Sequence, residues 1–178
     1  PSIRMVVCIP SGSTEVEIRA LRDSSAHAGG RDVYMIHEPL AAAIGIGIDV
    51  LEPMGNMIVD IGGGTSEIAV IALGGIVNNK SIRTAGDDFT SDIVEYVRKQ
   101  HNMHIGERTA EMIKIEVGSA LTELDNPPDE YAVHGRDLLT GIPKEIKVNY
   151  SEIAYCLDKS ISKIETAVLN ALEQTPPE

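Results

Sequence analysis

Residues 57–73, MIVDIGGGTSEIAVIAL, place three glycines and a threonine between two apolar runs. Both runs are rich in Val, Ile and other residues that favour β-strands. We therefore expect a strand over residues 57–61, a glycine turn and a second strand over residues 67–73. The question raised by this stretch is whether the turn only reverses the chain or also binds a ligand.

The flanking strands exclude two familiar phosphate-binding loops. A Walker A loop ends in Gly-Lys-Ser/Thr and leads into a helix, as does the dinucleotide-binding motif GxGxxG. Here Ser66-Glu67 and a strand follow instead. Consecutive backbone N–H groups of a strand–turn–strand loop can bind an anion, because glycine adopts the positive φ values that such a nest requires. The alternatives are a simple hairpin turn and a phosphate-binding turn built from Gly62, Gly63, Gly64 and Thr65.

Asp60 lies at the end of the first strand, with only Ile61 between it and the glycine turn. A carboxylate beside a bound phosphate repels it unless a hard cation such as Mg²⁺ lies between them, usually through water. In an ordinary hairpin, Asp60 would instead cap the turn. The residues alone leave both interpretations open.

The segment before the turn follows a strand–helix–strand order, which indicates an α/β fold with parallel pairing. We expect strands over residues 5–9 and 33–36, a helix over about 14–28 and a second helix over 38–48. After the turn we expect a third strand over 76–82, helices over 89–100 and 106–124, short strands over 131–135 and 145–148, and a long helix over 151–174.

Composition excludes several classes of protein. Of the 178 residues, 43% are hydrophobic and 24% charged, as in a globular chain. No apolar run approaches the ~20 residues of a membrane-spanning helix. The net charge of −12 disfavours nucleic acid as a partner, because non-specific binding to nucleic acid depends on neutralising phosphates with basic residues.

Six segments together resemble the MreB family of bacterial rod-shape proteins, a branch of the actin-like ATPase superfamily. They occur in the family's order and span nearly the whole sequence: VVCIPSGSTEVEIRAL, EPLAAAIGIGIDV, MIVDIGGGTSEIAVIALGGIV, GERTAEMIKIEVGSA, VHGRDLLTGIPKEIKVNYSEI and LEQTPPE. The resemblance implies a partial α/β, actin-like ATPase (ribonuclease H-like) fold with an inserted small α+β subdomain.

The resemblance also implies a division of the chain. Residues 1–50 correspond to the end of the first actin-like subdomain, and 51–85 to the nucleotide-bearing β-meander of the second large subdomain. Residues 86–150 form the inserted small subdomain, and the helix of 151–178 returns to the second large subdomain. The family's first phosphate loop and its adenine loop are not in this sequence, so we expect the isolated fragment to be inactive.

The family's functional residues match several positions. Asp60 matches the aspartate that holds Mg²⁺ through water. Glu38 matches the residue that orients the attacking water, although by itself it is also explained as a first-turn carboxylate favoured by the helix dipole. The family usually has an acidic residue before it, whereas this chain has His37, whose lack of negative charge could lower the pKa of Glu38. The loop around the β- and γ-phosphates matches Gly62, Gly63, Gly64 and Thr65.

Glu111 and Lys114 match a pair that contacts ribose and adenine in the family. Their i, i+3 spacing places both on one helix face. Without the resemblance, the same spacing is explained as a solvated ion pair worth only ~0.2–0.5 kcal/mol.

The resemblance implies a bacterial actin-like cytoskeletal protein that binds Mg-ATP, polymerises into filaments and hydrolyses ATP, organising cell-wall synthesis and rod shape. Its partners would be other copies of itself and membrane proteins of cell-wall elongation. It would be cytoplasmic, at the inner face of the cell membrane, with membrane contact only through segments absent here. The alternatives are another superfamily ATPase, such as a chaperone ATPase domain or a sugar kinase, and a nucleotide-free interaction module.

Overall fold

The computed structural model describes residues 3–176, which divide into two compact units. Unit 1 contains the described residues up to Ile61, residues 65–83 and the residues from Thr166 onward. Unit 2 contains residues 62–64 and 84–165. The glycine turn therefore belongs to unit 2, although the strands on either side of it belong to unit 1.

Unit 1 opens with the expected βαβ element. Strands β1 (Ile3–Ile9) and β2 (Gly30–His37) pair in parallel, and α1 (Glu15–His27) connects them. The start of α1 is fixed by a capping box, in which Glu17 N–H donates to the Thr14 hydroxyl at 3.3 Å and the Glu17 carboxylate accepts from Thr14 N–H at 2.8 Å. The parallel register ends with Ile9 opposite His37.

The second sheet of unit 1 is an antiparallel meander, which confirms the expected strand–turn–strand stretch. Its strands are β3 (Asn56–Ile61), β4 (Ser66–Ala72) and β5 (Gly75–Ile82), in that order. The central strand β4 is buried along almost its whole length. One face packs on α2 (Glu38–Gly45), through Ala43, Ile58 and Ile71. Helix α2 ends before the expected residue 48, because Gly47 takes a left-handed φ of +85°.

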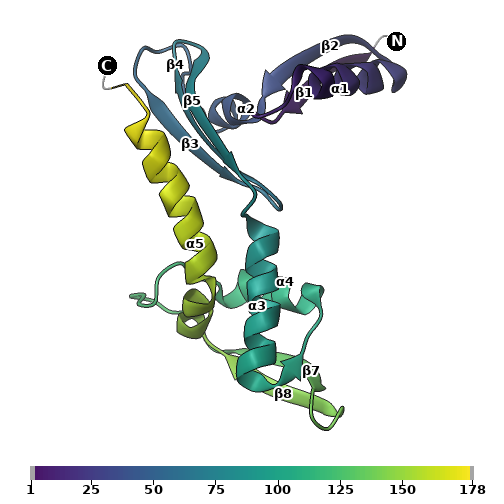
Figure 1. Cartoon of the computed structure of the whole chain (residues 1–178), viewed down its shortest axis with the longest axis vertical. Coiled ribbons are helices and arrows are strands. Elements are labelled where there is room, and N and C mark those ends of the chain that lie inside the picture. The colour runs from purple at the N-terminus through teal and green to yellow at the C-terminus, as the bar shows by residue number, and fades with distance from the viewer. Residues whose placement is uncertain (1–2, 177–178) are drawn as a thin grey trace. The chain divides into compact units, whose positions relative to one another are not determined.

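Unit 2 packs three helical segments with a small antiparallel sheet (Figure 1). Its elements are α3 (Gly86–His101), β6 (Met103–His104), α4 (Glu107–Val117), β7 (Tyr131–Asp137), β8 (Pro143–Val148) and the first part of α5 (Tyr150–Glu173). The expectation that α4 continues to residue 124 was wrong. Its C-cap, Gly118, is extended with ψ 136°, and this ends the helix seven residues early.

The end of α5 contributes to unit 1, where Ala167 and Ala171 pack with Ile68 of β4. The Asn78 side chain of β5 donates to the Ala171 carbonyl at 2.8 Å. No helix within residues 3–176 has the length and apolar composition needed to cross a membrane.

The core of unit 2 predicts a stability difference between two isoleucines of α4. Ile113 is 0% exposed, whereas Ile115 is 66% exposed. Ile113→Ala removes a buried side chain and leaves a cavity, so we expect it to lower the free energy of unfolding by about 2–5 kcal/mol. The matched surface change Ile115→Ala should alter it by less than about 0.5 kcal/mol. Urea denaturation followed by circular dichroism measures both, and equal losses would contradict the packing described for unit 2.

Candidate functional site

The glycine turn is tied to the first residues of α3. Gly86 N–H donates to the Gly62 carbonyl at 3.0 Å, and Asp87 N–H donates to the Gly63 carbonyl at 2.8 Å. The turn therefore uses carbonyl groups to bind α3. Among the hydrogen bonds of residues 3–176, none has Gly63 N–H or Gly64 N–H as its donor to a protein acceptor. The N–H groups of Gly63 and Gly64 are therefore able to donate hydrogen bonds to an anionic ligand.

The glycines of this turn do not have the conformation expected of them. Among the described residues, the glycines with positive φ are Gly29, Gly47, Gly74 and Gly141, so the expectation of left-handed glycines in the turn was wrong. A Cβ at Gly63 would lie 3.4 Å from both carboxylate oxygens of Asp87, which is an ordinary van der Waals separation. A tighter approach occurs at the start of α3, because a Cβ at Gly86 would lie 3.2 Å from the Gly62 carbonyl oxygen. The contact between the turn and α3 therefore constrains Gly86 more than Gly63.

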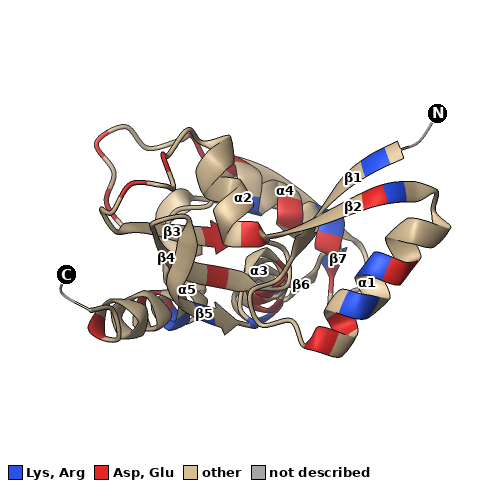
Figure 2. Ribbon diagram, turned by 90° about the horizontal axis from the view of Figure 1, so that it is seen from above, with Lys and Arg blue, Asp and Glu red and all other residues tan. Residues whose placement is uncertain are grey.

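Asp60 and Glu67 form a carboxylate pair across the β3–β4 hairpin of unit 1. The two residues are directly opposite in the antiparallel register. Asp60 is the one charged residue of β3, and Glu67 is the one charged residue of β4 (Figure 2). Glu67 is only 3% exposed, and both of its carboxylate oxygens lie 3.2 Å from Ser11 N, which donates to them. The hairpin therefore concentrates negative charge beside the glycine turn.

Glu38 is the first residue of α2 and is partly buried. Desolvation raises the pKa of this carboxyl above its ordinary value, and the negative charges of Glu67 and Asp60 raise it further. His37 is not among the causes of this shift, so the lowering expected from it stays a prediction. The Nδ1 atom of His37 is itself buried without a hydrogen-bond partner among the described residues. The structure thus places the candidate water-orienting carboxylate in an acidic environment.

In unit 2, Glu111 and Lys114 lie on one face of α4, as their spacing predicts, and form an ion pair of 2.7 Å. The Lys114 ammonium also donates to the Gly86 carbonyl at 3.0 Å and to the Thr90 hydroxyl at 3.1 Å. All three of its donors are therefore engaged by the protein. Lys114 joins α4 to the start of α3, and so to the residues that bind the glycine turn.

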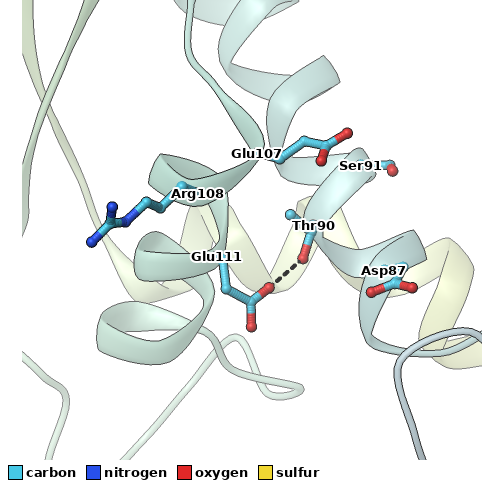
Figure 3. A pocket seen from close by; sticks show the side chains of 6 residues that line it. All are labelled: Asp87, Thr90, Ser91, Glu107, Arg108 and Glu111. Carbon is cyan, nitrogen blue, oxygen red and sulfur yellow. Dashed lines mark hydrogen bonds between the residues drawn. The ribbon is translucent and has the colours of Figure 1, made fainter.

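A pocket of about 370 Å³ opens between α3 and α4 (Figure 3). Glu111 faces it and accepts from the Thr90 hydroxyl at 2.6 Å. The hydrogen bond from the Lys114 ammonium, and after it the Thr90 bond, hold the pKa of Glu111 below its ordinary value. Arg108 points away from the other side chains in Figure 3. Acceptors predominate in the lining, which suits hydroxyl and amino donors such as those of a nucleoside. The lining residues are Asp87, Thr90, Ser91, Glu107, Arg108 and Glu111.

The predicted site residues fall into two groups. Unit 1 contains Glu38, Asp60 and Thr65, and unit 2 contains the three turn glycines with Glu111 and Lys114. Two residues of the candidate site, Thr90 and Glu67, were not predicted from the sequence. Thr90 has no distinguishing motif, whereas Glu67 carries one signal, a lone charge within an otherwise apolar strand.

Each unit by itself contains groups that fit a part of a magnesium–nucleotide ligand. A hard cation that keeps most of its waters needs only one or two carboxylates, and it would relieve the repulsion around Asp60. The amides of Gly63 and Gly64 suit phosphate oxygens, and the acceptor-rich pocket of unit 2 suits a nucleoside. A bound Mg²⁺ would supply charge neutralisation for a phosphate group.

Known proteins match the chain over its whole length. The model of the MreB/Mbl protein family matches residues 1–178. Cell shape-determining protein MreB of Escherichia coli (strain K12) is 49% identical over 181 residues, covering 100% of this chain and 51% of that protein. Cell shape-determining protein Mbl of Bacillus subtilis (strain 168) is 43% identical, covering 98% of this chain and 52% of that protein.

Solved structures agree with the sequence matches. The crystal structure of MreB 5 of Spiroplasma citri bound to AMPPNP superposes with a TM-score of 0.94 at 39% identity, over 99% of this chain and 52% of that one. The structure of the same protein bound to ADP gives a TM-score of 0.92 at 40% identity. The chain spans about half the length of these relatives. By its sequence and its actin-like ATPase fold, the chain belongs to the MreB/Mbl family of cell shape-determining proteins.

Proposed function

We propose that the full-length protein is a filament-forming ATPase that binds Mg-ATP, polymerises and hydrolyses the nucleotide, organising cell-wall synthesis and rod shape. The observation that carries this proposal is the carboxylate-flanked glycine turn, with two amides that have no protein acceptor among the described residues. The two Spiroplasma citri structures, one bound to AMPPNP and the other to ADP, support a nucleotide as its ligand.

Each candidate residue has a proposed role. Asp60 holds Mg²⁺ through water, and Glu38 orients the attacking water by accepting its hydrogen bond. Glu111 binds the nucleoside, and Lys114 contributes by fixing Glu111 and the start of α3. The loop at Gly62, Gly63, Gly64 and Thr65 binds the β- and γ-phosphates.

The proposal includes a cellular setting. The protein acts in the cytoplasm at the inner face of the cell membrane, with other copies of itself and with membrane proteins of cell-wall elongation. We also propose that the boundaries between subdomains lie near residues 50, 85 and 150.

Sedimentation tests the proposed function. Full-length protein incubated with Mg²⁺ and ATP is expected to pellet as filaments and to release phosphate, whereas protein without nucleotide stays in the supernatant. Protein that binds Mg-ATP but never pellets would contradict the cytoskeletal part of the proposal. Release of ADP only on addition of a sugar would favour a sugar kinase instead.

A further inference from the structure

Glu67 is a buried carboxylate with a partner far away in the sequence. It lies on the central strand β4, is 3% exposed, and accepts from the backbone N–H of Ser11 with both oxygens at 3.2 Å. Burying a carboxylate is costly unless hydrogen bonds compensate it. Here the neighbouring Asp60 and Glu38 add repulsion to that cost. A buried carboxylate with two acidic neighbours does not favour the stability of the fold, so its presence at Glu67 needs another explanation.

The Ser11 bond connects the two sheets of unit 1. Strands β1 and β2 form one sheet, and β3, β4 and β5 form another. Ser11 follows β1, whose last residue pairs with His37, and Glu38 comes directly after His37. On the other sheet, Glu67 pairs directly with Asp60. One side chain therefore links the sheet end that carries Glu38 to the hairpin that carries Asp60.

We propose that Glu67 is a positioning residue that holds the turn after β1 against the β3–β4 hairpin, and so fixes Glu38 relative to Asp60 within unit 1. This inference rests on the proposed ATPase function. Misplacing a catalytic group by about 1 Å can lower the reaction rate by about 100-fold. A fixed link between the two sheets therefore has a direct effect on the rate of hydrolysis.

A second role for Glu67 is electrostatic, since its charge also acts on Glu38. Two substitutions separate the roles. Glu67→Gln removes the charge but keeps a side-chain oxygen that can accept the hydrogen bond from Ser11 N–H. Glu67→Asp retains the charge but is shorter by one carbon–carbon bond, about 1.5 Å, and loses the 3.2 Å contact. If Glu67 acts by positioning, Glu67→Gln should preserve ATP hydrolysis and Glu67→Asp should not. If Glu67 acts through its charge, the reverse is expected.

The bond can also be removed from its other end. Ser13 N–H donates to the Pro10 carbonyl at 3.1 Å, so residues 10–13 form a turn with Ser11 at its second position. Proline is favoured there, and Ser11→Pro therefore removes the N–H donor with little change to the turn. Ser11→Ala is the matched control, because it keeps the N–H and removes only a hydroxyl that has no partner within the described residues.

The experiment measures kcat, nucleotide Kd and thermal midpoint in the full-length protein. Glu67→Asp and Ser11→Pro should each lower kcat by about 10–100-fold with Kd within about threefold, and the double variant should lose no more than either single variant. At a pH above the acid limb, where Glu38 is ionised in every variant, Glu67→Gln and Ser11→Ala should stay within about threefold of wild type. Equal loss in the Gln and Asp variants, or full activity in Ser11→Pro, would overturn the proposal.

Amide exchange of Ser11 gives a readout that is independent of ATP hydrolysis. The Ser11 amide should exchange slowly in the wild type and in Glu67→Gln, and at least about tenfold faster in Glu67→Asp. Unchanged exchange in Glu67→Asp would overturn the proposed link. If the wild-type protein bound no Mg-ATP, the proposed function would fail, and this exchange measurement would still decide whether Glu67 holds the turn.

Discussion

Glu38→Ala in the full-length protein is expected to lower kcat for ATP hydrolysis by about 100–10,000-fold while changing the Kd of Mg-ATP by less than about threefold. The reason is that a carboxylate that orients and deprotonates water acts in the transition state and contributes little to ground-state binding. Single-turnover phosphate release and equilibrium nucleotide binding measure the two quantities separately. A parallel loss of nucleotide affinity would contradict the assigned role.

Glu15→Ala is the matched control for Glu38. Glu15 is also the first residue of a helix, α1, but it is exposed. If Glu38 acted only through the helix dipole, both substitutions would cost about 0.3–1 kcal/mol of stability and neither would slow hydrolysis. We expect only the Glu38 variant to lose activity. A normal kcat in Glu38→Ala would leave the helix-dipole interpretation as the better one.

The raised pKa of Glu38 also determines the pH dependence of the reaction. Its carboxyl must be ionised to accept a proton, and burial together with Glu67 and Asp60 raises its pKa above the ordinary value. Since kcat/KM reports the free enzyme, its acid limb should lie at a higher pH than an ordinary glutamate would give. The same shift has a consequence for stability. A raised pKa in the folded state favours folding below the unfolded-state pKa, and this contribution is lost as the pH rises through the folded-state value.

Asp60→Ala is expected to weaken Mg-ATP binding by about 10–100-fold, because it removes the carboxylate that holds the hydrated cation. The effect should depend on magnesium. Without Mg²⁺, the variant should bind ATP no more weakly than the wild type, because the removed carboxylate only repels the phosphates. Calorimetric titrations with Mg²⁺ and with EDTA distinguish the two conditions.

Asp60→Asn controls for the shape of the side chain at this position. It retains a polar group of the same size opposite Glu67, so loss of the magnesium effect in both variants assigns that effect to the charge. An equal loss of ATP affinity with and without Mg²⁺ would indicate a disturbed hairpin instead. Normal Mg-ATP affinity in both variants would remove Asp60 from the proposed site.

The fold was largely predictable because its signals are local. The glycine turn between two β-rich runs predicted the hairpin, and the strand–helix–strand order predicted parallel pairing. The end of α4 was missed because residues after Val117 continue an apolar pattern, while the extended Gly118 ends the helix. The two-residue strand β6 was missed because it exists only through pairing with β7.

The site was less predictable because its key contacts connect distant residues. Glu67 and Ser11 are 56 positions apart, and no local pattern relates them. Lys114 has a partner at Gly86, 28 positions away, which changes its interpretation from an exposed member of an ion pair to a link between two helices. The close approach of Gly86 to the Gly62 carbonyl oxygen, where a Cβ would lie only 3.2 Å away, likewise depends on the folded chain.

Calorimetric titration of the full-length protein with Mg-ATP tests whether the protein has the proposed nucleotide site. We expect saturable binding of one nucleotide per chain with micromolar or tighter affinity, weakened by Asp60→Ala only when Mg²⁺ is present. The isolated 178-residue chain should bind far more weakly, because it spans about half the length of its nucleotide-bound structural relatives. Absence of Mg-ATP binding by the folded full-length protein would contradict the account.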